Sequence, residues 1–276
     1  MPDSNFVGVE KSLIGGGARQ HSRLTILMMS TRKRLLLSAI ICIAAARCAS
    51  AADHTESNDN LWLNYVGDHP LFGSKWGLHL ESQFRRADMG EHWQQLLLRP
   101  GINYTISPAL TLSAGYAWVE THPYGDIPIA AEFPENRLWE QAVVSHKALG
   151  LDWTHRFRLE QRRIGEVAPA TGDVTNWRYE NRIRYMLRTT IPLSDDKKWY
   201  LALWDELFFN FGSNVSMNYF DQNRAFIGLG RQLSPTTKLE IGFMEQTVQR
   251  RGGVVWENNH TVAVWLMSKW PFGSKN

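Results

Sequence analysis

Hydrophobic and polar residues alternate along most of the chain beyond residue 60, which is the pattern of β-strands with one apolar face. Three segments show it most clearly, at residues 75–86, 151–162 and 177–188. In the last two, one face holds Trp153, Phe157, Leu159, Trp177, Tyr179, Ile183, Tyr185 and Leu187. The opposite faces hold Arg156, Arg158, Glu160, Arg162, Arg178, Glu180, Arg182, Arg184 and Arg188, so they are charged along their whole length.

Further segments with the same period bring the number of expected strands to eleven, the first of them short. The others are 61–66, 96–106, 110–119, 138–147, 199–211, 224–233, 239–248 and 260–272. Most have the length that a tilted transmembrane strand needs. Tight joins, as at 148–150 and 234–236, alternate with longer loops, as at 121–135 and 165–176. Because bacterial barrels usually have an even number of strands, we expect ten to twelve.

These features predict an all-β fold, an antiparallel transmembrane β-barrel. Tryptophans stand near the ends of the expected strands, as interfacial girdles require; they are Trp76, Trp93, Trp118, Trp177, Trp199 and Trp270. A soluble β-sandwich or lipocalin-like barrel also alternates, but its apolar face points inward and its arginine-rich face is solvated. This alternative, a periplasmic β-protein that binds an acidic ligand, stays open at the level of sequence.

The N-terminal part has the order of a secretory signal peptide. Arg32, Lys33 and Arg34 precede an apolar stretch at 35–46, and the small residues 49–51 follow where a signal peptidase cuts. We expect a mis-assigned or disordered extension at 1–27, a cleaved signal peptide at 28–51 and the barrel domain at 52–276. The expected location is the bacterial outer membrane, with membrane lipids, periplasmic chaperones and the barrel assembly machinery as partners.

Charge and cysteine content change once the leader is removed. The leader holds seven of the 30 basic and two of the 27 acidic residues, so the remaining chain has a formal charge of −2 instead of +3. This balance gives no support to nucleic-acid binding. Both cysteines, Cys42 and Cys48, also belong to the leader, which excludes thiolate metal sites and cysteine nucleophiles from the mature domain.

The two strands that flank residues 165–176 carry the densest polar group. Their register predicts that Arg162 faces Glu180 and that Glu160 faces Arg182. Such pairs either form a packed interior that stabilises the barrel, or leave a surplus of arginines, with Arg85, Arg99 and Arg224, that attracts anions. In the second case, small anionic solutes are the expected partners.

Candidate chemistry is sparse. Glu206 and Asn210 share one face of the segment 199–211, with Asp205 beside them, and would serve an enzyme that modifies lipid or polysaccharide together with a loop histidine. However, no serine lies in a nucleophile motif, and Ser145 and His146 fall on opposite faces of a strand. The histidines lack metal-ligand spacing. We therefore expect no catalytic residue, no metal site and no cofactor.

Several short sequence motifs resemble those of a known family. They are Arg137-Leu138-Trp139-Glu140-Gln141, Arg156 to Arg162, Trp177 to Arg182 with Arg184-Tyr185, Asp205-Glu206 through Asn210, and Asn223-Arg224 running into Gly228-Leu229-Gly230. Together they resemble the bacterial DUF2490 family of outer-membrane β-barrel proteins, over residues 61–272. The resemblance implies a barrel and a surface location, and the family has no assigned activity. The sequence therefore favours a non-enzymatic barrel, either a closed scaffold or a narrow anion-preferring pore.

Overall fold

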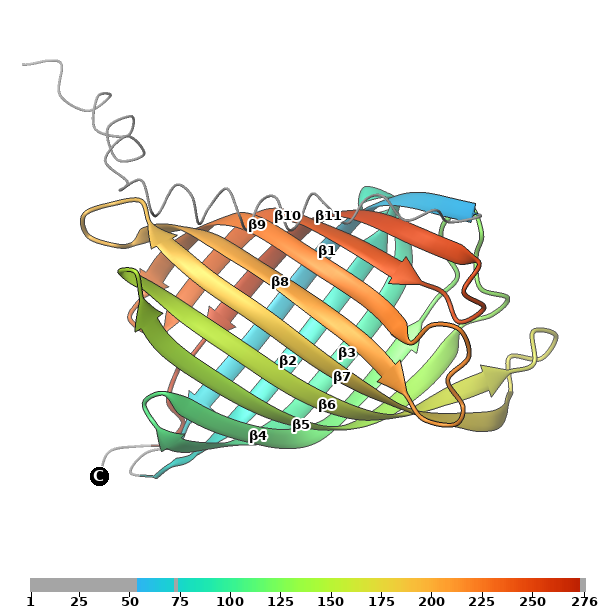
Figure 1. Ribbon diagram of the computed structural model, residues 1–276, viewed down its shortest axis with the longest axis horizontal. Helices are drawn as coiled ribbons and strands as arrows, with labels where there is room; N and C mark the ends of the chain where they lie inside the picture. The colour runs from blue at the N-terminus through green and yellow to red at the C-terminus, as the bar shows by residue number, and fades with distance from the viewer. Residues whose placement is uncertain (1–53, 72–73, 274–276) are drawn as a thin grey trace, which may run out of the picture. The chain divides into compact units, whose positions relative to one another are not determined.

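The computed structural model describes residues 54–71 and 74–273, and these form a single closed β-barrel (Figure 1). The predicted signal peptide and the extension before it lie outside the described residues. Within these residues, no helix is long and apolar enough to cross a membrane.

Eleven strands make the barrel, with one short 3-10 helix, η1 (Asp88–Gly90), between the second and third. The strands are β1 (His54–Pro70), β2 (Trp76–Ala87), β3 (His92–Ser107), β4 (Leu110–Thr121), β5 (Phe133–Ala148), β6 (Leu151–Val167), β7 (Val174–Pro192), β8 (Trp199–Phe211), β9 (Phe220–Ser234), β10 (Thr237–Gln249) and β11 (Val255–Ser268). The predicted strand at 61–66 is the middle of β1, which is much longer because its polar start also pairs with β11.

The barrel closes through a parallel pair. Ten pairs of neighbouring strands are antiparallel, as predicted. β1 and β11 run in the same direction, because an odd number of alternating strands leaves the first and last parallel. Residues beyond β11 continue this seam: the ring of Phe272 stacks on His69 at 4.3 Å, and its backbone N–H donates to the Pro70 carbonyl at 2.9 Å. Closure leaves no free sheet edge between β1 and β11.

Connections differ between the two ends of the barrel, as the sequence predicts (Figure 1). At one end, β3–β4, β5–β6 and β9–β10 are joined by two residues each, at 108–109, 149–150 and 235–236. At the other end, the β4–β5 and β8–β9 loops span 122–132 and 212–219. We call the second end the loop end.

The apolar faces of the strands point outward and the polar faces point into the barrel. On β7, Ile183 is 48% exposed, whereas its neighbours Arg182 and Arg184 are 4% and 5% exposed. The same contrast holds around the barrel, where exposed apolar side chains include Leu80, Phe84, Ile102, Leu138, Leu229 and Phe243. The soluble alternative expects the opposite orientation, with the apolar face inside.

Glycines make room for large side chains in the interior. The indole of Trp139 on β5 is buried and lies over Gly101 and Gly115, which face each other on β3 and β4. A Cβ atom on Gly115 would stand 2.3 Å from the Pro100 carbonyl oxygen. On the opposite wall, an apolar cluster of β1 and β8–β11 fills the interior with Trp62, Tyr200, Ala202, Trp204, Phe226, Met244 and Ala263.

Candidate functional site in the barrel interior

The register between β6 and β7 pairs Glu160 with Arg182 and Arg162 with Glu180, as predicted. All four side chains point inward, because residues two positions apart on a strand face the same side. Arg182 donates to Glu160 at 2.6 Å, whereas the Arg162–Glu180 ion pair is longer, at 3.8 Å. The cross-strand prediction is therefore confirmed.

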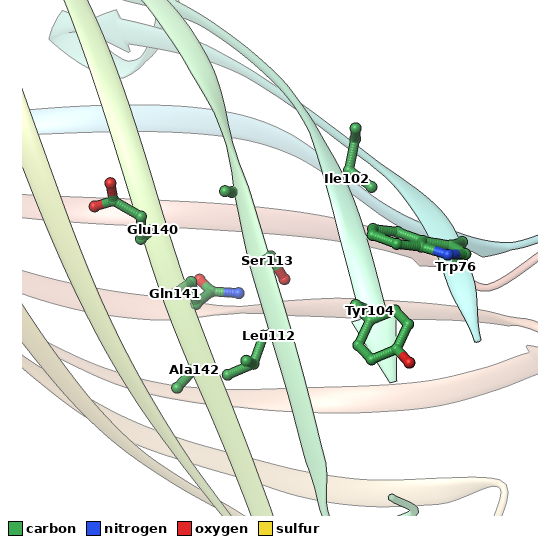
Figure 2. A pocket seen from close by; sticks show the side chains of 9 residues that line it. Trp76, Ile102, Tyr104, Leu112, Ser113, Glu140, Gln141 and Ala142 are labelled. Atoms are coloured by element: carbon green, nitrogen blue, oxygen red, sulfur yellow. The ribbon is translucent and has the colours of Figure 1, made fainter. Parts of the chain in front are cut away.

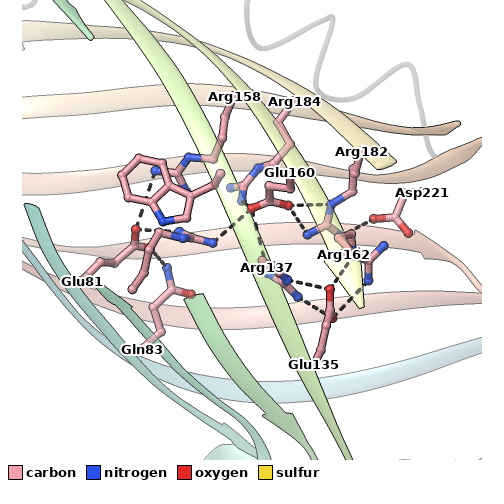
Figure 3. Close-up of polar contacts among 12 residues, drawn as sticks. Glu81, Gln83, Glu135, Arg137, Arg158, Glu160, Arg162, Arg182, Arg184 and Asp221 are labelled. Atoms are coloured by element: carbon pink, nitrogen blue, oxygen red, sulfur yellow. Dashed lines mark hydrogen bonds and ion pairs between the residues drawn. The ribbon is translucent and has the colours of Figure 1, made fainter. Parts of the chain in front are cut away.

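Glu160 is the centre of an ion-pair network that reaches across the barrel (Figure 3). Its carboxylate has no solvent exposure and accepts hydrogen bonds from Arg182 at 2.6 Å, Arg184 at 2.8 Å and Arg99 at 3.1 Å. Arg137 adds a fourth guanidinium at 4.0 Å. Because Arg99 lies on β3, this carboxylate links strands that are not neighbours in the sheet.

Three more carboxylates extend the network. Glu135 accepts from Arg137 at 2.7 Å and from Arg162 at 2.5 Å. Asp221 on β9 accepts from Arg182 at 2.7 Å. Glu81 on β2 accepts from Arg99 at 2.6 Å and lies 3.7 Å from Arg158. None of the three was singled out from the sequence as a candidate, although Glu81 shares the polar face of its strand with Gln83 and Arg85.

Glu206 and Asn210 both point inward from β8 but bind different partners. Glu206 is bound by Arg156 at 2.8 Å and by Arg184 at 2.9 Å. The amide of Asn210 donates to Asp221 at 3.1 Å. Guanidinium groups occupy both oxygens of Glu206, so the geometry gives no support to its use as an enzymatic carboxylate.

The remaining predicted positions lie near the loop end. Arg178 donates to Glu180 at 2.7 Å and to Glu166 at 3.0 Å. Arg224 projects inward from β9, and its register partner is Glu206. The ion pairs of that carboxylate are with Arg184 and Arg156.

A cavity of about 480 Å³ lies beneath the loop end. Nine arginines line it: Arg85, Arg137, Arg162, Arg178, Arg182, Arg184, Arg224, Arg250 and Arg251. Seven of them have a carboxylate within 3.9 Å. Among the described residues, Arg85 and Arg224 form no ion pair. Arg99, which the sequence groups with them, is not part of this surplus because Glu81 and Glu160 neutralise it.

The loop 122–132 covers this cavity from the β4–β5 side. Tyr124 donates to Glu257 on β11 at 2.6 Å, and the Ile127 backbone N–H donates to Glu56 on β1 at 3.1 Å. Arg250 binds both carboxylates and the Ile127 carbonyl. Burial and the nearby Glu257 carboxylate raise the pKa of Tyr124 above its usual value, so its hydroxyl remains a hydrogen-bond donor. These contacts fasten the loop to the opposite wall.

A second cavity of about 140 Å³ lies deeper in the barrel and shares Arg184 and Arg224 with the first as lining residues. The two arginines therefore stand between the two spaces. Glu206 and Glu240 also line the deeper cavity, so both spaces have charged walls.

The outer wall carries a groove of about 600 Å³ (Figure 2). Trp76, Ile102, Tyr104 and Leu112 line it, with Glu140 at its edge. The groove belongs to the apolar exterior, since these aromatic and aliphatic side chains point away from the interior. It is separate from the charged cavities.

Taken together, fold and interior define a single-chain, closed β-barrel with an apolar exterior and an ion-paired, arginine-rich interior. The chain belongs to the DUF2490 family of proteins of unknown function, whose model matches residues 59–258. It is also 30% identical over 251 residues to an uncharacterized protein of Methylorubrum extorquens, in an alignment that covers 88% of this chain and 100% of the relative. Among solved structures, the NanC porin is similar with a TM-score of 0.41 and 12% identity, over 70% of this chain and 89% of that one.

Proposed function

We propose that this protein is an integral barrel of the bacterial outer membrane. The observation that carries the proposal is the inverted polarity of the barrel, with apolar side chains outside and charged ones inside. An exterior of this kind is unfavourable in water and favourable in lipid, where every backbone polar group must be paired within the barrel. Strands of 12 to 19 residues exceed the length needed to cross a bilayer.

Tryptophans on the outer face support the same placement. Trp93 and Trp177 are exposed toward the loop end, and Trp76, Trp199 and Trp270 toward the other end. Two such belts match the two interfaces of a membrane. The proposed partners are outer-membrane lipids and, during biogenesis, periplasmic chaperones and the barrel assembly machinery.

We further propose that the interior is a narrow passage that prefers anions and has no enzymatic role. Its support is the pair Arg85 and Arg224 at the cavity beneath the loop end, which form no ion pair within the described residues. Unpaired arginines in a confined space attract anions and repel cations. The network around Glu160 fills the interior beside these two arginines and leaves the passage narrow.

The location is tested by fractionating the cells and running the outer-membrane material on a detergent gel with and without boiling. A folded membrane barrel resists detergent and migrates differently until it is heated. Release into the soluble periplasm with no such shift would refute the membrane proposal.

The pore is tested by reconstituting the purified barrel in planar bilayers and measuring reversal potentials across a KCl gradient. The wild type is expected to prefer chloride, and the double variant Arg85→Gln/Arg224→Gln to lose most of that preference. The matched control is Arg163→Gln/Arg231→Gln, which removes two exposed arginines that lie over Trp177 and Trp199 on the outer face. A heat-modifiable barrel that conducts no current would favour the closed scaffold instead.

A further inference from the structure

Two arginines and two aromatic rings form a stack beside the cavity of about 480 Å³ beneath the loop end. The Arg85 guanidinium lies 4.0 Å from the ring centre of Trp62, and the Arg224 guanidinium lies 5.0 Å from the same ring. Arg224 also lies 4.8 Å from the ring of Phe208. Trp62 and Phe208 are fully buried, so the rings fix the two guanidinium groups from below.

Contacts within the described residues provide only some of the hydrogen-bond acceptors that these two arginines need, and no ion pair. Arg224 is 5% exposed and donates through Nε to the Gln222 side chain at 3.1 Å, and its two terminal nitrogens have no acceptor in the described part of the chain. Arg85 is 7% exposed and donates to the neutral amides of Gln83 and Gln95. Buried charges are normally paired with an opposite charge, since removing an ion from water is costly.

The described residues around Arg85 and Arg224 do not supply the missing ion-pair partner. Glu206 stands opposite Arg224 in the register, yet its ion pairs are with Arg156 and Arg184, and it forms none with Arg224. Both guanidinium groups also line the cavity of about 480 Å³, which is large enough for a small organic molecule. The missing partner of the two arginines therefore has room to come from outside the protein.

We propose that Arg85 and Arg224 form a binding site for a small hydroxylated organic anion, whose carboxylate or phosphate is held by the two guanidinium groups. Guanidinium binds both groups through paired hydrogen bonds. Gln94, Gln95, Thr121 and Gln246 also line the cavity and supply partners for hydroxyl groups. The loop 122–132 covers the site through Tyr124 and Ile129. This inference rests on the proposed function only for the route by which the anion arrives.

The site is tested by isothermal titration calorimetry on the full-length barrel folded in detergent. The probes are glucuronate, which carries a carboxylate, glucose 6-phosphate, which carries a phosphate, and neutral glucose. We expect saturable binding of at least one of the two anions and none of glucose. Which anion binds distinguishes a carboxylate ligand from a phosphate ligand.

The variant Arg224→Gln removes the charge and shortens the side chain, but it leaves a polar amide at the position. It is expected to weaken anion binding by about ten- to a hundredfold, the loss typical of a hydrogen bond to a charged group. The control Arg231→Gln removes an exposed arginine from the outer face of the same strand and should leave the affinity unchanged. If Arg224→Gln does not show the heat-dependent gel shift, Arg85→Gln takes its place.

Equal affinity in the wild type and in the folded variants, or no saturable binding of either anion, would overturn the site. Binding in detergent does not depend on conduction. A barrel that binds the anion without conducting current would therefore overturn only the pore, and one that conducts without binding would overturn only this site.

Discussion

The substitution Glu160→Gln tests whether the ion-pair network stabilises the barrel. It exchanges a carboxylate for an amide of the same shape and removes one negative charge. Three guanidinium groups within 3.1 Å, those of Arg99, Arg182 and Arg184, lose their shared partner. The Arg182 side chain keeps Asp221, and Arg99 keeps Glu81, so the fold retains other links across the interior.

The magnitude follows from burial and distance. At an effective dielectric constant of about 20, one charge pair 4 Å apart contributes about 4 kcal/mol of Coulomb energy, and Glu160 makes three shorter ones. Much of this energy is offset by the desolvation of the charges. Breaking a buried pair by removing one partner typically costs about 3–5 kcal/mol. We expect the free energy of unfolding to fall by that amount.

The measurement is a urea titration of the barrel in lipid vesicles, followed by tryptophan fluorescence. The control is Glu91→Gln, the same exchange at an exposed glutamate in the connection between β2 and β3, outside the strands. It should change the free energy of unfolding by no more than about 0.5 kcal/mol.

A loss of less than about 1 kcal/mol in Glu160→Gln would refute the reasoning. It would mean that water solvates these arginines about as well as the carboxylate does, and that the interior is wet rather than filled by ion pairs. In that case the same variant should conduct like the wild type. A dry, ion-paired interior instead predicts a stronger preference for anions once the negative charge is gone.

Two further substitutions test other features of the barrel. Gly115→Ala should lower the free energy of unfolding by about 1–3 kcal/mol, since its Cβ would meet the Pro100 carbonyl oxygen at 2.3 Å, whereas Gly252→Ala, with open space around it, should have little effect in the same urea titration. Tyr124→Phe removes the hydrogen bond to Glu257, so the loop 122–132 should be cleaved faster by added protease in intact vesicles, and an unchanged cleavage rate would show that the other contacts hold the loop alone.

The sequence predicts the barrel because the alternation of apolar and polar residues can be recognised within each strand by itself. Each strand needs only one apolar face, so alternation at 177–188 or 151–162 identifies the strand and its faces before any partner is known. The register of β6 against β7 was predictable for the same reason, since one loop joins them and opposite charges face each other. The boundaries of β1 were not, because its polar N-terminal half is held as a strand by pairing with β11.

The sequence by itself determined which side chains share a face, that many of them are charged, and that arginines exceed the carboxylates beside them. Only the tertiary structure decided which face is inside, which arginines are neutralised and where a cavity remains. Those outcomes depend on contacts between strands distant in sequence, such as Arg99 with Glu160, and on the ion pairs of Glu206 with Arg156 and Arg184. The alternation of apolar and polar residues carries no information on these contacts, because it describes each strand separately. The ion pairs form only where closure of the barrel brings the strands together.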